Sequence, residues 1–156
     1  MIGIFIGWLA YKEAHNAFAE AAKAKDAATA AKDAANKAGK TVKKQSMLLA
    51  LSEATRVMTQ IRQNINYEDA NNKVMEINGK VRNIMGFYRD DLIQNHQPLL
   101  QQIEGCASDL LTEFNLLDPD VENRIIYNKI RPNISVLVGH LNELQGILEN
   151  ELILNN

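Results

Sequence analysis

The sequence predicts an all-α protein in which a long N-terminal helix, made of a short apolar anchor and an Ala-rich coiled-coil-like stalk, continues into a C-terminal antiparallel helical bundle. Apolar residues recur at steps of three and four along most of the chain, which is the period of a helix face. Only three prolines and eight glycines occur in 156 residues, so little material is left for turns. No stretch alternates between apolar and polar residues as a half-buried strand does.

Composition and charge divide the chain into three regions: an apolar membrane-anchor segment at 1–11, an Ala/Lys-rich helical stalk at 12–45 and a bundle domain at 46–156. Residues 12–44 carry eight lysines against four acids, a net charge of +4, whereas residues 45–156 carry nine Lys or Arg against fifteen Asp or Glu, a net charge of −6. A basic stretch between an apolar start and an acidic body is typical of a membrane-proximal stalk. The acidic total disfavours nucleic acid as a partner.

The first eleven residues, MIGIFIGWLAY, contain no charge and predict an anchor. As a helix they would span about 16 Å, half of the roughly 30 Å hydrocarbon core, which is expected if the anchor only dips into the bilayer or if the segment continues upstream of Met1. The lysines that follow predict a membrane-associated protein whose C-terminal body faces the cytoplasm. A buried N-terminal segment of a soluble protein is the alternative. The predicted anchor side chains are Ile2, Ile4, Phe5, Ile6, Trp8 and Leu9.

The next region combines strong helix propensity with a regular pattern of small residues. Thirteen of the thirty-three residues at 12–44 are alanine, the best helix former. Small residues recur at alternating steps of four and three, which predicts a seam where helices approach closely; Ala22, about 100° round the helix from Ala21, lies outside it. A solvated single helix is the alternative. The predicted oligomerisation seam consists of Gly3, Gly7, Ala10, Ala14, Ala17, Ala21, Ala24, Ala28, Ala31, Ala35 and Ala38.

Large apolar side chains replace alanine after Gln45, and the steps of three and four continue. They predict that the first helix runs unbroken to about Asn64. Asn66 is a suitable N-cap, with acids in the first turn behind it, for a second helix that extends to about residue 93. The two predicted core stripes are Met47, Leu51, Ala54, Met58, Ile61 and Ile65, then Tyr67, Ala70, Val74, Ile77, Val81, Ile84 and Tyr88.

Proline marks the last two predicted helices. Pro98 suits the first position of a third helix, and Asp118-Pro119-Asp120 predicts the start of a fourth. Pro132 lies inside that fourth helix and predicts a kink or a short break, because it cannot donate a hydrogen bond to the Asn128 carbonyl. The predicted core stripes are Leu99, Leu100, Ile103, Ala107, Leu110, Leu111, Phe114 and Leu117, then Ile134, Leu137, Leu141, Leu144, Leu148 and Leu152.

Residues with catalytic or metal-binding potential are isolated in this sequence. Cys106 is the single cysteine, and the acids near it, Glu104 and Asp109, disfavour a reactive thiolate. His140 and Glu143 have the three-residue spacing of bundle metal sites, but such sites need a second copy and further carboxylates. We therefore predict no catalytic residue, no cofactor, no metal and no small-molecule substrate.

Together these features predict a non-catalytic, membrane-tethered scaffold or adaptor. We expect it to self-associate through its N-terminal helix and to present the acidic bundle to a protein partner. Two alternatives stay open: a pore-forming or membrane-perturbing effector whose small-residue helices assemble side by side, and a soluble helical module that regulates or binds another protein.

Overall fold

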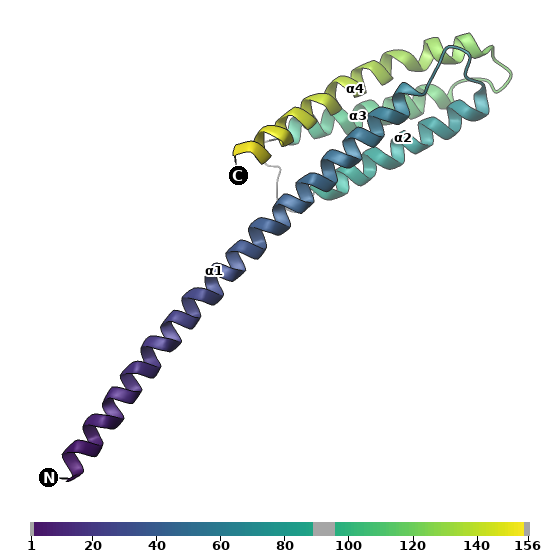
Figure 1. The fold of residues 1–156 in the computed structure, drawn as a ribbon. Helices are drawn as coiled ribbons and strands as arrows, with labels where there is room; N and C mark the ends of the chain where they lie inside the picture. Colours follow the sequence, from purple (N-terminus) through teal and green to yellow (C-terminus); the bar gives the residue numbers. More distant parts are fainter. Residues whose placement is uncertain (1, 89–95, 155–156) are drawn as a thin grey trace. The chain divides into compact units, whose positions relative to one another are not determined.

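A computed structural model confirms the all-α class. It describes the backbone of residues 2–88 and 96–154 and the side chains of residues 11–86 and 96–154. Within these ranges it contains four helices and no strand: α1 (Ile2–Thr59), α2 (Tyr67–Tyr88), α3 (Gln97–Asn115) and α4 (Asn123–Leu154) (Figure 1). The chain divides into two compact units, residues 1–42 and residues 43–156.

The first unit consists of the N-terminal part of α1. Every residue from 11 to 40 is exposed. The hydroxyls of Thr29 and Thr41 donate to the carbonyls of Lys25 and Lys37, four residues earlier in the same helix. This part of α1 is therefore stabilised by the helix propensity of alanine and by bonds within the helix, and its described side chains form no buried core.

The second unit is the predicted helical bundle, built from residues 43–59 of α1 together with α2, α3 and α4 (Figure 1). Helix α3 packs against both α2 and α4. Each helix contributes a stripe of buried apolar side chains to one continuous core. The largest fully buried side chains include Phe114, Met47, Leu51, Ile77, Leu110 and Leu141.

The predicted core stripes are confirmed where the structure describes them. The side chain of Tyr88 lies outside the described residues, and Ile65, Tyr67, Leu111 and Leu117 pack against the core while staying partly exposed. Ile134 and Leu152 are likewise half-buried at the edge of the α4 stripe. The core also includes three side chains that the sequence pattern did not single out: Val57, Ile126 and Ile130.

The connection between α1 and α2 confirms the predicted N-cap. Asn66 Oδ1 accepts a hydrogen bond from the Asp69 N–H at 2.7 Å, and Asn66 Nδ2 donates to Asp69 Oδ2 at 2.8 Å. This reciprocal pair satisfies a free backbone donor in the first turn and places a carboxylate at the positive end of the helix.

Helix α1 ends at Thr59, earlier than the predicted end near Asn64. The N–H groups of Gln60 and Ile61 donate to carbonyls only three residues back, at 3.2 Å each. This tighter winding satisfies the last carbonyls of the helix and ends it. The predicted end of the second helix near residue 93 lies outside the described residues.

The predicted start of the fourth helix was wrong. Asp118 Oδ1 accepts from the Asp120 N–H at 2.9 Å, and the Asp118 carbonyl accepts from the Val121 N–H at 3.1 Å. These bonds form a turn, because a short acid can bond its own backbone two residues on. Helix α4 begins later, at Asn123, with the Glu122 carbonyl as the first acceptor.

Proline has different effects in the two later helices. Pro98 lies in the first turn of α3, one residue after the helix begins at Gln97, where its missing N–H costs no helical bond. At Pro132 the sequence predicted a kink or a short break, and the break does not occur, since α4 runs from Asn123 to Leu154 without interruption. Pro132 and Asn128 are both exposed, so water can bond the carbonyl that lacks a donor.

Candidate interaction surfaces

The predicted anchor lies at the beginning of α1. The side chains of residues 1–10, including all six anchor residues, lie outside the described residues, although the helical backbone begins at Ile2. Within the part of the chain that the structure describes, no helix combines the length and the apolarity that crossing a membrane requires.

The predicted seam lies along the exposed part of α1. All of its alanines from Ala14 to Ala38 are exposed. Gly3, Gly7 and Ala10, the first three seam positions, belong to the same helix, but their surroundings lie outside the described residues. Within the first unit, no described side chain covers the alanines of the seam.

An exposed aromatic pair on the same helix escaped the sequence analysis. Tyr11 is 69% exposed and Phe18 is 82% exposed, an unusual degree for side chains of this size. Both side chains line a shallow, almost entirely apolar hollow of about 440 Å³ on one side of α1. The signal in the sequence was the seven-residue spacing of Tyr11 and Phe18, which places both rings on one side of a helix. We call this surface the aromatic face; it is lined by Tyr11, Ala14, His15, Phe18, Ala19 and Ala22.

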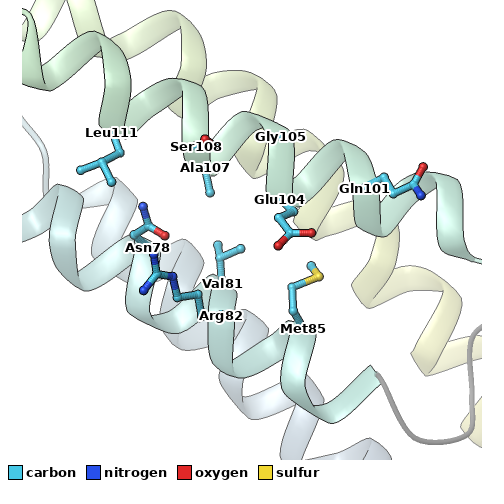
Figure 2. A pocket seen from close by; sticks show the side chains of 10 residues that line it. All are labelled: Asn78, Val81, Arg82, Met85, Gln101, Glu104, Gly105, Ala107, Ser108 and Leu111. Atoms are coloured by element: carbon cyan, nitrogen blue, oxygen red, sulfur yellow. The ribbon is translucent and has the colours of Figure 1, made fainter.

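A second surface lies between α2 and α3, where a cleft of about 500 Å³ opens on the bundle (Figure 2). The buried side chains of Val81 and Ala107 form its floor. The wall that α3 contributes to the cleft includes Gly105 and Ser108, whose side chains are small. Figure 2 shows polar side chains around this floor, and the polar rim consists of Asn78, Arg82, Gln101, Glu104 and Ser108.

The end of the bundle where α4 finishes contains a cluster of three charged or titratable side chains. Glu151 Oε2 lies 2.7 Å from Lys44 Nζ, and Glu151 Oε1 lies 3.2 Å from His96 Nε2. Lys44 is only 8% exposed, which is rare for a lysine. The cluster joins α1, the N-cap of α3 and the last turn of α4.

Opposing effects act on the Glu151 carboxyl. Burial alone would raise its pKa, but hydrogen bonds from Lys44 and His96, together with their charges, outweigh burial and lower the pKa below its ordinary value. Glu151 is therefore a carboxylate at neutral pH, and it neutralises a lysine that the fold has removed from water.

The side chains with possible reactive chemistry lie elsewhere in the bundle. Cys106 is half-buried, and burial followed by the charge of Asp109 raises the pKa of its thiol, so the thiol stays protonated at neutral pH. His140 and Glu143 are both on α4, and among the described residues no three His, Cys, Asp or Glu side chains are grouped so that they could hold a metal ion.

Comparison with known proteins gives no relative from which a role could be transferred. No family model, no curated protein and no solved structure matches the chain. The fold and the surfaces described above are therefore the basis on which a function can be assigned.

Proposed function

We propose that this protein is a non-catalytic helical scaffold or adaptor that is tethered at a membrane by the start of α1. It self-associates through the seam of that helix and presents the acidic bundle to a protein partner. The observation that carries the proposal is the exposure of every residue from 11 to 40, on a helix whose small and aromatic residues are arranged in faces.

Exposure on this scale supports an external partner for α1. Most helices in proteins owe more of their stability to packing of an apolar face than to helix propensity. The described side chains of residues 11–40 have no such packing within the chain, since all of them are exposed. Alanine seams gain from close approach of a second helix, because backbone and methyl groups then make dispersion contacts on both sides. A second copy of the same helix offers a matching seam.

Two features of the sequence support a tether at the membrane. Residues 1–11 have no charge, so placing them at depth in a bilayer desolvates no ionised group. Eight lysines follow by residue 44, and each lysine near an anionic membrane surface contributes about 1 kcal/mol. The net charge of −6 on residues 45–156 is repelled by the same surface and remains turned toward proteins in solution.

The cleft between α2 and α3 is the surface that we propose for the protein partner. An amphipathic helix can dock in such a groove by placing apolar side chains on Val81 and Ala107. Arg82 on one rim and Glu104 on the other form no ion pair with each other or with other described residues, so each can bind an opposite charge on the partner.

The test of self-association is a pair of matched substitutions in the full-length protein. Ala21→Leu places a bulky side chain in the seam, pushes the backbones apart and should weaken assembly. Ala30→Leu is the control, because nine residues at 100° each place Ala30 about 180° round the helix from Ala21. Ala22 is unsuitable as a control, since it borders the aromatic face.

Sedimentation velocity in mild detergent measures both variants against the unsubstituted protein. We expect the Ala30→Leu protein to assemble normally and the Ala21→Leu protein to shift toward the monomer. Equal assembly of the two variants would mean that the alanines supply helix propensity alone, and self-association through the seam would be disproved. Release of dye from vesicles by the unsubstituted protein would instead assign a pore-forming effector.

A tether predicts a second result. Deleting residues 2–11 should release the protein from vesicles in a flotation assay while leaving the helical content of the bundle unchanged. A protein that never floats with vesicles, with or without residues 2–11, has no membrane tether.

A further inference from the structure

We propose that the aromatic face of α1 lies against the surface of an anionic bilayer, with Phe18 in the interfacial layer and Glu20 in water. This inference rests on the proposed function, because it specifies which side of the tethering helix contacts lipid. The occupant to which it commits is a lipid surface that carries negative charge.

The first support is the row of residues that contains the two aromatics. Tyr11, Phe18 and Lys25 follow one another at steps of seven, and seven residues bring a helix back to within about 20° of the same side. All three side chains are exposed. With increasing distance from the uncharged start of the chain, this row changes from the aromatic side chains of Tyr11 and Phe18 to the basic side chain of Lys25. Aromatic rings favour the membrane interface, and lysine reaches the lipid headgroups just outside it.

The second support is the position of the acids. Glu20 is two residues from Phe18, about 200° round the helix, and Glu13 is five residues from it, about 140° away in the shorter direction. Both acids are exposed. When the aromatic face contacts a negatively charged surface, the two carboxylates of this part of the helix therefore point away from it. Lys12 and Lys23 lie about 120° and 140° from Phe18, so they are also turned away from that surface. Within residues 11–25 the side that faces the bilayer therefore carries Lys25 and no acid, which suits an anionic surface.

The third support is continuity with the apolar start. Helix α1 is unbroken from Ile2, so the aromatic face belongs to the same straight element as the uncharged residues 2–10. That element is apolar all round at its beginning and apolar on one side from residue 11 to residue 22. A helix of this kind lies obliquely in the interface, with its beginning deepest and its charged side in water.

Self-association and lipid contact can occur together, because the seam and the aromatic face share only Ala14 and otherwise use neighbouring sides of the helix. Ala21 belongs to the seam and Ala22 to the aromatic face, and adjacent residues are about 100° apart. A second copy packed on the seam therefore leaves Phe18 and Ala22 available to the bilayer.

The experiment places an environment-sensitive dye on one side of the helix or on the other. Ala22→Cys labels the aromatic face, and Glu20→Cys labels the opposite side at nearly the same depth along the helix. Both substitutions are made in the full-length protein carrying Cys106→Ala, so that the dye has one attachment site. The probes are vesicles of phosphatidylcholine alone and vesicles of equal parts phosphatidylcholine and phosphatidylglycerol.

We expect the emission of the dye at position 22 to shift to the blue on the anionic vesicles, and the dye at position 20 to keep the emission that it has in water. Phe18→Ser should weaken binding to these vesicles about tenfold or more, because burying one phenylalanine side chain favours transfer by at least that factor. Asn16→Ser, on the polar side, should leave binding unchanged.

The other outcomes separate this inference from the tether on which it rests. If the protein floats with vesicles while neither dye shifts, residues 2–10 hold it alone and the aromatic face does not contact lipid. If both dyes shift equally, the helix is enclosed on all sides. If the dye at position 22 shifts with protein concentration in the absence of vesicles, a second copy covers the face. Each of these overturns the inference, whereas failure to float at all overturns the tether.

Discussion

Phe18 and Phe114 both lie on helices with an apolar repeat of three and four, yet Phe18 is 82% exposed and Phe114 is 0% exposed. Phe114 belongs to a bundle whose facing stripes are rich in leucine and isoleucine. The centroid of its ring lies 4.9 Å from the centroid of the Tyr67 ring. Phe18 lies in the exposed part of α1, residues 11–40, where the other apolar residues are mainly alanine. The spacing of apolar residues is the same in the two units, but these residues are mainly alanine in the first unit and mainly larger side chains in the second.

Side-chain size decides whether a helix face can close a core within its own chain. A fully buried leucine or isoleucine contributes roughly 1.5–3 kcal/mol, which offsets the entropy lost when the connecting turns are ordered. Alanine buries far less area and supplies helix propensity instead. Residues 43–156 therefore fold on themselves, whereas the apolar side chains of residues 11–40 stay exposed.

The largest expected effect contrasts the two phenylalanines directly. Phe114→Ala should lower the free energy of unfolding of the bundle by about 3–5 kcal/mol, because it leaves a cavity at a fully buried position. Phe18→Ala should change that free energy by less than about 0.5 kcal/mol, since the ring is exposed. Urea unfolding followed by circular dichroism measures both. A Phe18→Ala loss as large as that of Phe114→Ala would show that the first unit contributes to the core.

A smaller effect is expected at the charged cluster that closes the bundle. Glu151→Gln leaves Lys44 without its carboxylate, and we expect a loss of about 1–2 kcal/mol at neutral pH, reduced from the value for a fully buried pair because Glu151 is partly exposed. Glu149→Gln removes the same charge two residues earlier on an exposed side chain and should cost less than about 0.5 kcal/mol. Equal losses would indicate a general effect of net charge.

The same cluster has a defined pH dependence. Since the pKa of Glu151 is lowered in the folded protein, its stabilisation is fully present above the ordinary value of 4.5 and is lost as the pH falls through the lower, folded-state pKa. The difference in unfolding free energy between Glu151→Gln and the unsubstituted protein should therefore shrink well below pH 4.5. A difference that persists in acid would mean that the carboxylate charge is not its source.

The fold was predictable where the information is local. The stripe through Ile103, Ala107 and Leu110 shows its period and its size within two turns of sequence, and it is buried as predicted. Asp118 was assigned wrongly because an N-cap and a turn use the same bond from a short acid to a nearby N–H. The choice between them was set five residues later, where the helix begins at Asn123.

The candidate surfaces were less accessible to sequence reasoning. Lys44 and Glu151 are more than one hundred positions apart, and only the packing of α1 beside α4 brings them to 2.7 Å. The aromatic face was missed for another reason. The regular alanines dominate this part of the sequence, and the sequence pattern does not show that Phe18 is exposed.

Glycines provide a finer comparison, because both units have helical glycines with open space around them. A methyl group added at Gly105 in α3 or at Gly39 in α1 meets no atom within 4 Å. Gly105→Ala should raise the unfolding free energy of the bundle by about 0.5–1 kcal/mol through helix propensity. Gly39→Ala should leave it unchanged, because that turn of helix lies outside the bundle core. Urea unfolding measures both variants. If Gly39→Ala also stabilised the bundle, the two units would be shown to be energetically coupled.

The smallest expected effect comes from the largest change, the removal of the first 35 residues. The buried core begins at Met47 and the cluster with Glu151 requires Lys44, so a chain that starts at residue 36 keeps both, with two helical turns to spare. We expect its unfolding free energy to match that of the full-length protein within about 0.5 kcal/mol.

A chain that starts at residue 46 lacks Lys44 and should lose about as much unfolding free energy as Glu151→Gln does. Urea unfolding of the two shortened chains provides the measurement, and the residue at which stability begins to fall locates where the bundle starts. A substantial loss in the chain that starts at residue 36 would mean that the exposed part of α1 stabilises the bundle, and the separation of roles between the two units would then be wrong.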